Sequence, residues 1–366
     1  MRSRNRILFL ARIPPPFTGM TNATHAVWTL IGKPKTIHFD KVYGWLSKRK
    51  MTYVITAIHS IVSLARILME RKPSIVYLCY NQGKIGRLIS FIIVYVAEIA
   101  GHQVVIHHHV YGYIRNSGLL EPISFKGVSS SVFHLSLGQS MTEDLIKNCH
   151  IDRNRISSLR NFYAIKTPDV IPSQPNKNIG RTEITFGFIS NITIEKGIGE
   201  IEWLSSMIDP HDAVRIIIAG GCNNQAVEKM LERLVANKSV NIEWLGPVYG
   251  DEKAKFFSKI DCLLFPTLYM NEAQPLVLIE AASYGLPFIS YNRGGIVEIA
   301  NLFKSDAVDT RKQFLDSFNN FIFKAKNSPR ELKKQRMSRR STFIKLREIE
   351  IARLCAFFET MQQKLD

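Results

Sequence analysis

The sequence NEAQPLVLIEAASYGLPFIS, residues 271–290, decides the fold. The apolar run 262–265 precedes this stretch and ends at Pro266, and a second short apolar run, 288–290, closes it. Pro275 suits the first turn of a helix, because a proline at that position gives up no hydrogen bond. The expected order is therefore strand, loop, helix, turn and strand.

Two carboxylates flank the start of this expected helix. Glu272 lies in the loop, beside the free amides of the helix N-terminus, and Glu280 lies about a turn and a half into the helix. Free backbone N–H groups at a helix N-terminus bind anions, and carboxylates accept hydrogen bonds from hydroxyl groups. An anion joined to a polyol is what a nucleotide sugar presents. An ordinary amphipathic helix with solvated glutamates is the alternative interpretation.

The same stretch resembles the signature of the retaining family 4 glycosyltransferases of the GT-B fold. The resemblance rests on Glu272, Glu280 and the residues after the second glutamate, Ala281-Ala282-Ser283-Tyr284-Gly285-Leu286-Pro287. It implies an α/β fold with two doubly wound, Rossmann-like domains that face each other across a cleft. It also implies that Glu280 holds the ribose hydroxyls of a nucleotide sugar and that Glu272 holds the donor sugar.

Length and composition fit two domains of ordinary size. The chain has 366 residues, of which 46% are hydrophobic and 22% charged, as in soluble globular proteins. The longest apolar run, 88–100, is too short to span a bilayer, so we expect a buried helix there.

Residues 1–16 begin like a signal peptide but run into three prolines, which favours a first buried strand. The five scattered cysteines fit a reducing cytosol.

Both halves of the chain alternate short apolar runs with helical patterns, which is typical of parallel sheets covered by helices. Residues 166–182 break the alternation with three prolines and form the expected linker. We expect an N-terminal domain over 1–165, which binds the acceptor by the resemblance, and a C-terminal nucleotide-sugar-binding domain over 183–340. The resemblance implies that 341–366 form a helix that crosses back to the first domain. The expected strands are 6–11, 36–39, 75–80, 104–109, 132–137 and 156–159, then 184–189, 214–219, 242–245, 262–265 and 288–290.

The first loop of the second domain, residues 187–197, is similar to the family loop that holds the donor diphosphate. Lys196 matches the lysine of that loop, whereas Asn191 falls where the family has an arginine. An asparagine brings no charge, so the resemblance puts more of the diphosphate's stabilisation on Lys196 and on helix amides. A surface lysine before a helix is the alternative for Lys196. The donor-binding residues implied in this domain are Asn191, Gly220, Gln274, Pro275, Leu276 and Glu280.

The loop 14–20 of the first domain contains one glycine, Gly19. In the family, a glycine-containing loop at this place approaches the donor diphosphate and the acceptor. A rigid proline turn is the alternative interpretation.

Three consecutive histidines end an expected strand, and alternation puts His107 and His109 on one face and His108 on the other. The family places one histidine over the donor sugar, and His109 fits best, with His107 second. At most two of the three converge, so we expect no metal site.

The net charge is +17, from 48 basic and 31 acidic residues. Residues 1–50 hold ten Lys or Arg and one acid, Asp40, and residues 324–353 hold eleven basic and three acidic residues. Such a charge attracts polyanions. We expect an anionic membrane surface as partner, mainly because the enzyme implied by the resemblance has a lipid acceptor. No nucleic-acid-binding module is recognisable, so nucleic acid is not an expected partner. A solvated basic face is the alternative.

Together these features predict a retaining, metal-independent hexosyltransferase with Glu272, Lys196 and His109 as its catalytic residues. The donor is a UDP- or GDP-sugar, and the acceptor is a lipid-linked or oligosaccharide molecule of bacterial O-antigen, capsule or lipopolysaccharide synthesis. No cofactor or metal is expected, since there is no Asp-x-Asp motif. The enzyme is expected in the cytoplasm, peripheral on the inner face of the cytoplasmic membrane. A GT-B nucleotide-sugar 2-epimerase and a non-catalytic basic binding protein remain alternatives.

Overall fold

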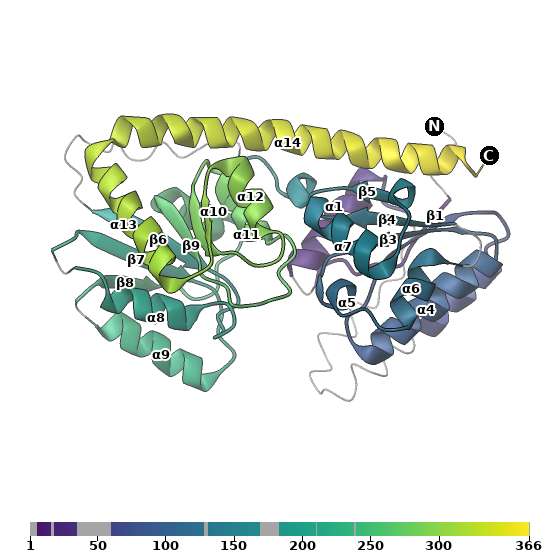
Figure 1. The fold of residues 1–366 in the computed structure, drawn as a ribbon, viewed down its shortest axis with the longest axis horizontal. Helices are drawn as coiled ribbons and strands as arrows, with labels where there is room; N and C mark the ends of the chain where they lie inside the picture. The colour runs from purple at the N-terminus through teal and green to yellow at the C-terminus, as the bar shows by residue number, and fades with distance from the viewer. Residues whose placement is uncertain are drawn as a thin grey trace. The chain divides into compact units, whose positions relative to one another are not determined.

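The computed structural model describes residues 6–15, 18–34, 60–127, 131–168, 183–209, 211–237 and 239–365. The chain divides into two compact units, which we call unit 1 (Met1–Ala164 with Glu348–Asp366) and unit 2 (Ile165–Arg347). Each unit is built from a parallel sheet and helices, as the ribbon in Figure 1 shows. Among the helices of the described ranges, none combines the length and the apolar character needed to cross a bilayer.

Unit 1 contains a five-stranded parallel sheet in the order β1-β2-β3-β4-β5. Its strands are β1 (Ile7–Phe9), β2 (Ile75–Cys79), β3 (Gln103–His107), β4 (Val132–Ser136) and β5 (Ile156–Ser158). Its helices are α1 (Gly19–Leu30), an unlabelled helix over 60–69, α4 (Lys84–Ile99), α5 (Gly112–Arg115), α6 (Leu120–Lys126) and α7 (Gln139–Cys149), with the 3-10 turns η1 (Arg153–Arg155) and η2 (Asn161–Ala164). The strands are mostly buried, as in parallel sheets with both faces covered.

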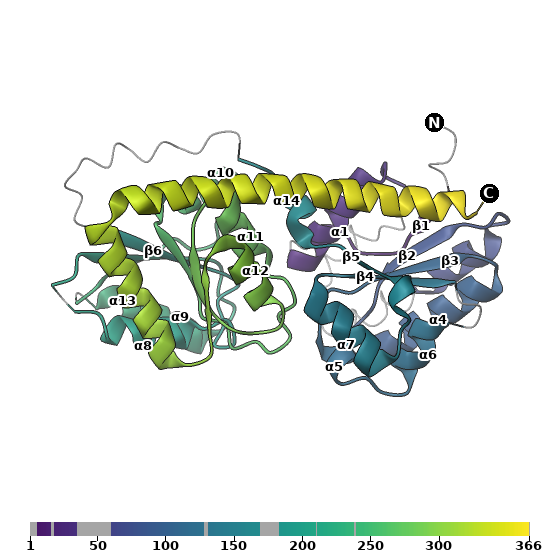
Figure 2. The ribbon, with the colours of Figure 1, turned by 45° about the horizontal axis from the view of Figure 1, so that its top comes forward.

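The last helix, α14 (Pro329–Gln363), begins in unit 2 and ends in unit 1 (Figure 2). Its final turns contribute Leu354, Phe358 and Met361 to the same buried cluster as Ile7 and Tyr77. This apolar packing explains why residues 348–366 belong to unit 1 although they follow unit 2 in sequence.

Unit 2 contains a six-stranded parallel sheet in the order β11-β10-β9-β6-β7-β8. Its strands are β6 (Ile184–Ile189), β7 (Val214–Ala219), β8 (Asn241–Trp244), β9 (Cys262–Phe265), β10 (Phe288–Tyr291) and β11 (Asp306–Val308). Its helices are α8 (Ile198–Ser206), α9 (Gln225–Ala236), α10 (Gly250–Lys259), α11 (Leu276–Ser283), α12 (Ile296–Phe303) and α13 (Arg311–Asn327). The chain adds strands to one side of β6 as far as β8, then returns to the other side at β9.

Several predicted boundaries differ from those observed. The strand predicted over 104–109 ends at His107, because the His108 amide makes the last bond to β4, to Leu135 O at 2.9 Å. The helix predicted over 341–366 begins at Pro329, a residue that fits the first turn of a helix, and ends at Gln363. The strand β11 was not predicted, and the strand predicted over 36–39 lies outside the described residues, as does most of the predicted linker.

Candidate functional site

Two loops of unit 2 leave the sheet where its strand order reverses. Residues 190–197 follow β6, and residues 266–275 follow the adjacent strand β9. In open α/β sheets, ligands bind at this switch point, beyond the carboxyl ends of the strands. The two loops are hydrogen-bonded to each other, since the Leu268 amide donates to Glu195 O at 2.8 Å.

A glycine permits this close approach of the two loops. Gly197 has φ +94°, and a Cβ atom on it would lie 2.1 Å from the carbonyl oxygen of Pro266. Only glycine adopts this backbone without strain and leaves the space that the other loop needs. The preceding residue, Lys196, is held by a hydrogen bond from its amide to the Thr193 hydroxyl at 3.1 Å. The backbone around Lys196 is thus fixed on both sides.

Lys196 and Glu272 form an ion pair across the two loops, from Nζ to Oε1. The same carboxylate oxygen accepts a hydrogen bond from Thr267 at 3.2 Å, and Lys196 Nζ lies 4.9 Å from the centre of the Tyr269 ring. The Glu272 side chain is 9% exposed, whereas that of Lys196 is 29% exposed. The ammonium therefore remains accessible to an anion, beside an acceptor oriented by two donors. The structure brings together two of the three predicted catalytic residues.

The helix α11 begins at Leu276, one residue later than predicted, because Pro275 has the extended backbone of an N-cap, with ψ 118°. No side chain caps this helix start in the described chain, so its first amides are available as anion donors. Gln274 is buried directly before it. Glu272 thus lies in the loop that leads into α11, as predicted.

Glu280, on α11, has a partner that sequence reasoning missed. Lys253 on α10 donates from Nζ to Glu280 Oε1 at 2.6 Å, and both side chains are partly exposed. No spacing rule connects two residues on different helices, so the sequence held no signal for this pair. The contact fixes the direction of the carboxylate that is predicted to hold a ribose.

The remaining predicted residues of unit 2 differ in their surroundings. Asn191 is exposed in the loop after β6. Gly220 directly follows β7 and has φ +127°. A Cβ there would lie 1.7 Å from Ser190 O, so this glycine supports the same loop. Arg293, which was not predicted as a site residue, follows β10, and its Nε is buried without a hydrogen-bond partner among the described residues. Because the Gly295 amide donates to Ala273 O at 3.1 Å, the loop of Arg293 adjoins the loop of Glu272.

In unit 1, Gly19 is the first residue of α1 rather than part of a loop, because Thr18 caps the helix with a capping box. The rings of His107 and His109 lie 4.1 Å apart, as strand alternation predicts. The Nε2 atoms of both are buried without a hydrogen-bond partner among the described residues. Burial lowers the pKa of His109 to about 4 and that of His107 well below its usual range, so both imidazoles are neutral at pH 7.

His108 points the other way and belongs to a buried hydrogen-bonded chain. His134 Nε2 lies 3.0 Å from Phe125 O, which only accepts, so this nitrogen carries the proton and Nδ1 of His134 is an acceptor. His108 Nε2 then donates to His134 Nδ1 at 2.9 Å, and His108 Nδ1 accepts from the Tyr113 hydroxyl at 3.0 Å. Both rings are fully buried. His108 is therefore part of the packed interior.

Within the described part of the chain, no group of three or more His, Cys, Asp or Glu side chains is placed to hold a metal ion. The two neighbouring histidines of unit 1, His107 and His109, accordingly lack a third ligand of these types.

Two sequence comparisons match parts of this chain. Residues 171–336 match the family of glycosyl transferases group 1. A curated relative, the phosphatidylinositol N-acetylglucosaminyltransferase gpi3 subunit of Schizosaccharomyces pombe, is 28% identical over 195 residues, which are 52% of this chain and 41% of the relative. The chain thus matches less than half of that relative's length.

Solved structures cover nearly the whole chain. HepE (Alr3699) of Anabaena, in complex with UDP, superposes with a TM-score of 0.69 at 13% identity, over 96% of this chain and 100% of HepE. The apo form of WaaB, a lipopolysaccharide outer core galactosyltransferase, gives a TM-score of 0.67 at 16% identity, over 97% and 99% of the two chains. The protein therefore has the GT-B fold of these glycosyltransferases, and its second unit carries the segment that matches the glycosyl transferases group 1.

Proposed function

We propose that the protein is a family 4 glycosyltransferase that moves a hexose from a nucleoside-diphosphate sugar to an acceptor with retention of configuration. The observation that carries this proposal is the Lys196–Glu272 ion pair at the switch point of unit 2. An accessible ammonium beside a carboxylate and an uncapped helix start provides donors for a diphosphate and an acceptor for sugar hydroxyls.

The proposed mechanism is electrostatic and uses no metal. Lys196 and the first amides of α11, near Leu276, stabilise the charge that develops on the diphosphate as the bond from the sugar C1 to the phosphate oxygen breaks. The acceptor oxygen attacks C1 from the same face, and the leaving phosphate oxygen takes the acceptor's proton. Glu272 orients the sugar ring through its hydroxyls, and His109 is the third proposed catalytic residue. Nε2 of the neutral His109 has no hydrogen-bond partner among the described residues, so it retains the capacity to bond a sugar hydroxyl.

Asn191 supplies no charge to the diphosphate, and we propose that Arg293 compensates in part. Its loop adjoins the Glu272 loop through the Gly295–Ala273 hydrogen bond, and its buried Nε has capacity for an acceptor. Glu280, oriented by Lys253, would bind the ribose, with Gln274 and Gly220 lining the donor. Guanidinium groups bind phosphate oxygens well, because their planar donors match the geometry of the anion.

For the acceptor we propose a lipid-linked or oligosaccharide molecule in the assembly of bacterial surface polysaccharide, such as O-antigen, capsule or lipopolysaccharide. The name of WaaB, a lipopolysaccharide galactosyltransferase, supports this class. The name of the fission yeast relative, which includes phosphatidylinositol, also supports a lipid acceptor. The net charge of +17 favours association with anionic lipid. The enzyme would then work in the cytoplasm, on the inner face of the membrane.

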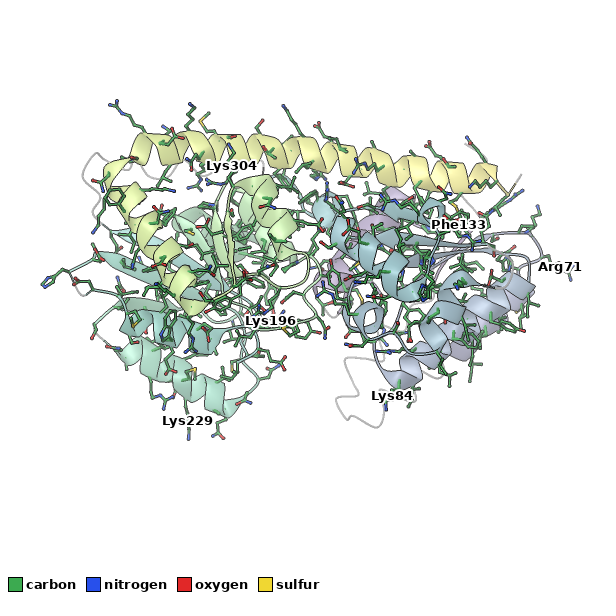
Figure 3. All side chains as sticks on the ribbon, in the orientation of Figure 1. Arg71, Lys84, Phe133, Lys196, Lys229 and Lys304 are labelled. Atoms are coloured by element: carbon green, nitrogen blue, oxygen red, sulfur yellow. The ribbon has the colours of Figure 1, made fainter. Side chains whose placement is uncertain are left out.

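The proposal is tested first by ligand-induced stabilisation. The melting temperature is measured with UDP, GDP, ADP and their common sugar derivatives, since a ligand that binds the native state raises it by mass action. UDP is the first choice because HepE was solved with UDP. We expect a shift with one base, absent in Lys196→Ala and retained in Lys229→Ala, an exposed lysine of α9 that Figure 3 labels away from Lys196.

Product analysis then separates the candidate reactions. Transfer of the sugar to a membrane-extracted acceptor, with the anomeric configuration of the donor, is the expected result. Conversion of the donor into its 2-epimer would identify an epimerase instead. A folded protein that shows no shift with any nucleotide, and whose binding to polyanions falls steeply with salt, would instead be a basic binding protein.

A further inference from the structure

The outward face of α4 in unit 1 is apolar along the whole helix. Five large side chains lie there at spacings of three and four residues, which places them on one face. We call these residues the α4 face; with their exposed fractions they are Ile85 62%, Leu88 47%, Ile92 38%, Tyr95 45% and Ile99 65%. The opposite side packs into unit 1 through Ile93, Val94 and Ala97. The helix is therefore apolar toward both the interior and the solvent.

This pattern is unusual for a surface helix, which normally presents charged or polar residues to water. After Arg87, the only charged residue of α4 is Glu98, which is 6% exposed and accepts a hydrogen bond from Ser131 at 2.8 Å. The neighbouring helix α6 adds an exposed Ile123, and Leu119 precedes it with 87% of its surface exposed. Contiguous exposed apolar surface of this kind marks an interaction site.

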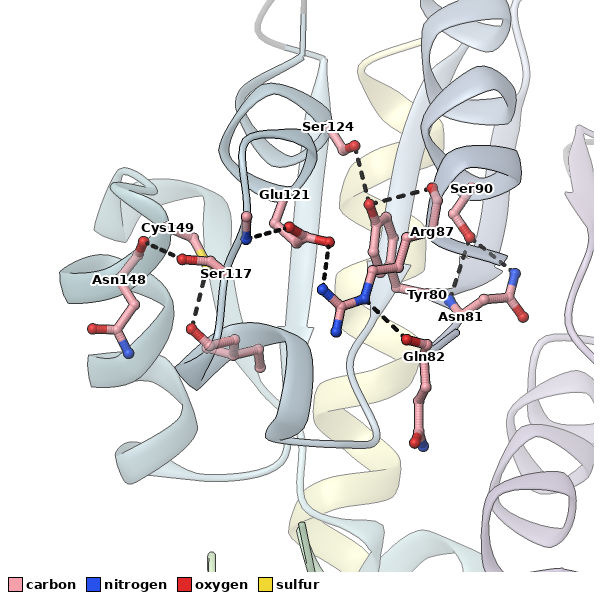
Figure 4. A network of polar contacts seen from close by, with 12 residues as sticks. Tyr80, Asn81, Gln82, Arg87, Ser90, Ser117, Glu121, Ser124, Asn148 and Cys149 are labelled. Atoms are coloured by element: carbon pink, nitrogen blue, oxygen red, sulfur yellow. Dashed lines mark hydrogen bonds and ion pairs between the residues drawn. The ribbon is translucent and has the colours of Figure 1, made fainter. Parts of the chain in front are cut away.

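A buried polar network fixes α6 beside α4 (Figure 4). Arg87 of α4 pairs with Glu121 of α6 at 3.2 Å, and Glu121 also accepts the Gly118 amide at 2.7 Å. The Tyr80 hydroxyl bonds to Ser124 of α6 at 3.2 Å. Glu121 is 1% exposed, so the acidic group of α6 is hidden and neutralised. The apolar surface thus belongs to a fixed pair of helices that exposes no acidic side chain.

Basic residues lie at both ends of the α4 face. Lys84 begins the helix. Arg71 and Lys72 are exposed near its other end, because Ser74 bonds to His102 and Gln103, which follow the helix, at 3.2 and 3.0 Å. Figure 3 labels Lys84 and Arg71 at opposite ends of the helix. The face therefore combines an apolar centre with positively charged ends.

We propose that the α4 face docks on a lipid bilayer with anionic headgroups. The apolar side chains would lie at the boundary between headgroups and acyl chains, and the basic ends would bind lipid phosphates. Tyr95, with its polar tip, suits this interfacial depth. A second copy of the chain is a poorer partner, because pairing two such faces brings like charges together. This inference deepens the proposed function and rests on it for the lipid-linked acceptor, which docking would bring within reach.

Flotation with vesicles tests the proposal. The full chain is mixed with vesicles of phosphatidylcholine alone or with a third of phosphatidylglycerol, and the bound fraction is measured at two salt concentrations. We expect binding to the anionic vesicles and a drop of at least tenfold in partitioning for the double variant Ile92→Glu, Ile99→Glu. The matched control is Val235→Glu, Phe323→Glu, which changes two exposed apolar residues of unit 2 by the same charge. The control is expected to bind within twofold of the wild type.

Three results would overturn the proposal. The wild type could fail to float, the two double variants could lose binding equally, or the α4 variant could float normally while its sedimentation changes from dimer to monomer. The last result would make the face an interface between copies. The melting temperature of each variant is also measured with and without the nucleotide that stabilises the wild type. A retained shift in the α4 variant shows that the fold and the donor site are intact, so a failure of docking is distinguishable from a failure of the proposed enzyme.

Discussion

Lys253 on α10 and Glu280 on α11 form a hydrogen-bonded ion pair of 2.6 Å, which joins two helices of unit 2. Both side chains are partly exposed, at 31% and 20%. An exposed pair contributes little to stability, about 0–1 kcal/mol. The pair therefore matters more for the direction of the Glu280 carboxylate than for the fold. This makes Lys253 a positioning residue for the proposed ribose contact.

We expect Lys253→Met to raise the KM for the donor by roughly three- to tenfold while kcat changes little. A contact to the ribose is the same in the ground state and the transition state, so losing its orientation removes uniform binding. Steady-state kinetics with varied donor checks this split. Lys255→Met, an exposed lysine of the same helix, is the control. A fall in kcat with unchanged KM would show that Lys253 does not act through donor binding.

Lys196→Ala should lower kcat by roughly a hundred- to a thousandfold, the cost of losing a preorganised charge that stabilises the leaving group. Glu272→Gln should also lower turnover strongly. The glutamine side chain is neutral, and its NH2 group cannot accept the hydrogen bond that Glu272 now accepts from the Lys196 ammonium. Single-turnover assays measure both effects, and circular dichroism checks the fold. Near-normal turnover in either variant would contradict the assignment of the ion pair to catalysis.

Much of the sheet architecture could be predicted from the sequence. The observed β6, β7 and β9 match their predicted bounds, because each is an apolar run with strong strand preference between turn-forming residues. The missed β11, Asp306–Val308, has three residues and an exposed aspartate, and only its pairing with β10 defines it. Short strands of this kind depend on a neighbouring strand that local sequence does not specify.

The sequence indicated the motif residues of the candidate site, but it did not indicate which side chains they contact. Lys196 and Glu272 lie 76 positions apart, and their ion pair depends on how two loops meet at the sheet edge. Thr267, which bonds to Glu272, lies five positions before it but belongs to no motif. The alternation of the three histidines was predicted correctly, since it follows from strand geometry alone. The hydrogen-bonded chain from His108 through His134 depends on packing between β3 and β4.

The buried histidines make stability depend on pH. The pKa of His134 and that of His109 are each lowered to about 4 by burial, against about 6.5 in the unfolded chain. The unfolded state therefore binds more protons between these values, and the stabilisation present above pH 6.5 is lost as the pH falls toward 4. A shift of this size corresponds to roughly 3 kcal/mol for each group.

We expect the melting temperature to fall steeply from pH 6.5 to pH 4.5 and the fall to be shallower in His134→Gln. Glutamine is still able to donate to Phe125 O but takes up no proton in this range. The control is His211→Gln, an exposed histidine of unit 2 that should leave the slope unchanged. If His134→Gln and the wild type lose stability in parallel, protonation of His134 does not drive the acid transition.

The end of α14 is fastened to unit 1 by a buried carboxylate. Glu350 is fully buried, and its carboxylate lies 3.0 Å from Arg353 and 3.6 Å from Arg160 and accepts the backbone amide of Arg160 at 3.3 Å. Burial raises the pKa of Glu350, so its ionised form is held only because these donors surround it.

Glu350→Ala should lower the free energy of unfolding by about 3 kcal/mol, because it leaves the Arg160 amide and guanidinium without their acceptor. Glu350→Gln should cost less, since its amide oxygen still accepts the Arg160 amide. Urea unfolding measures both losses, and hydrogen exchange along residues 348–363 locates them. The control Glu348→Ala, two positions away and exposed, should stay within about 0.5 kcal/mol of the wild type. If Glu350→Ala matched that control, apolar packing by Leu354 and Phe358 alone would hold the helix to unit 1.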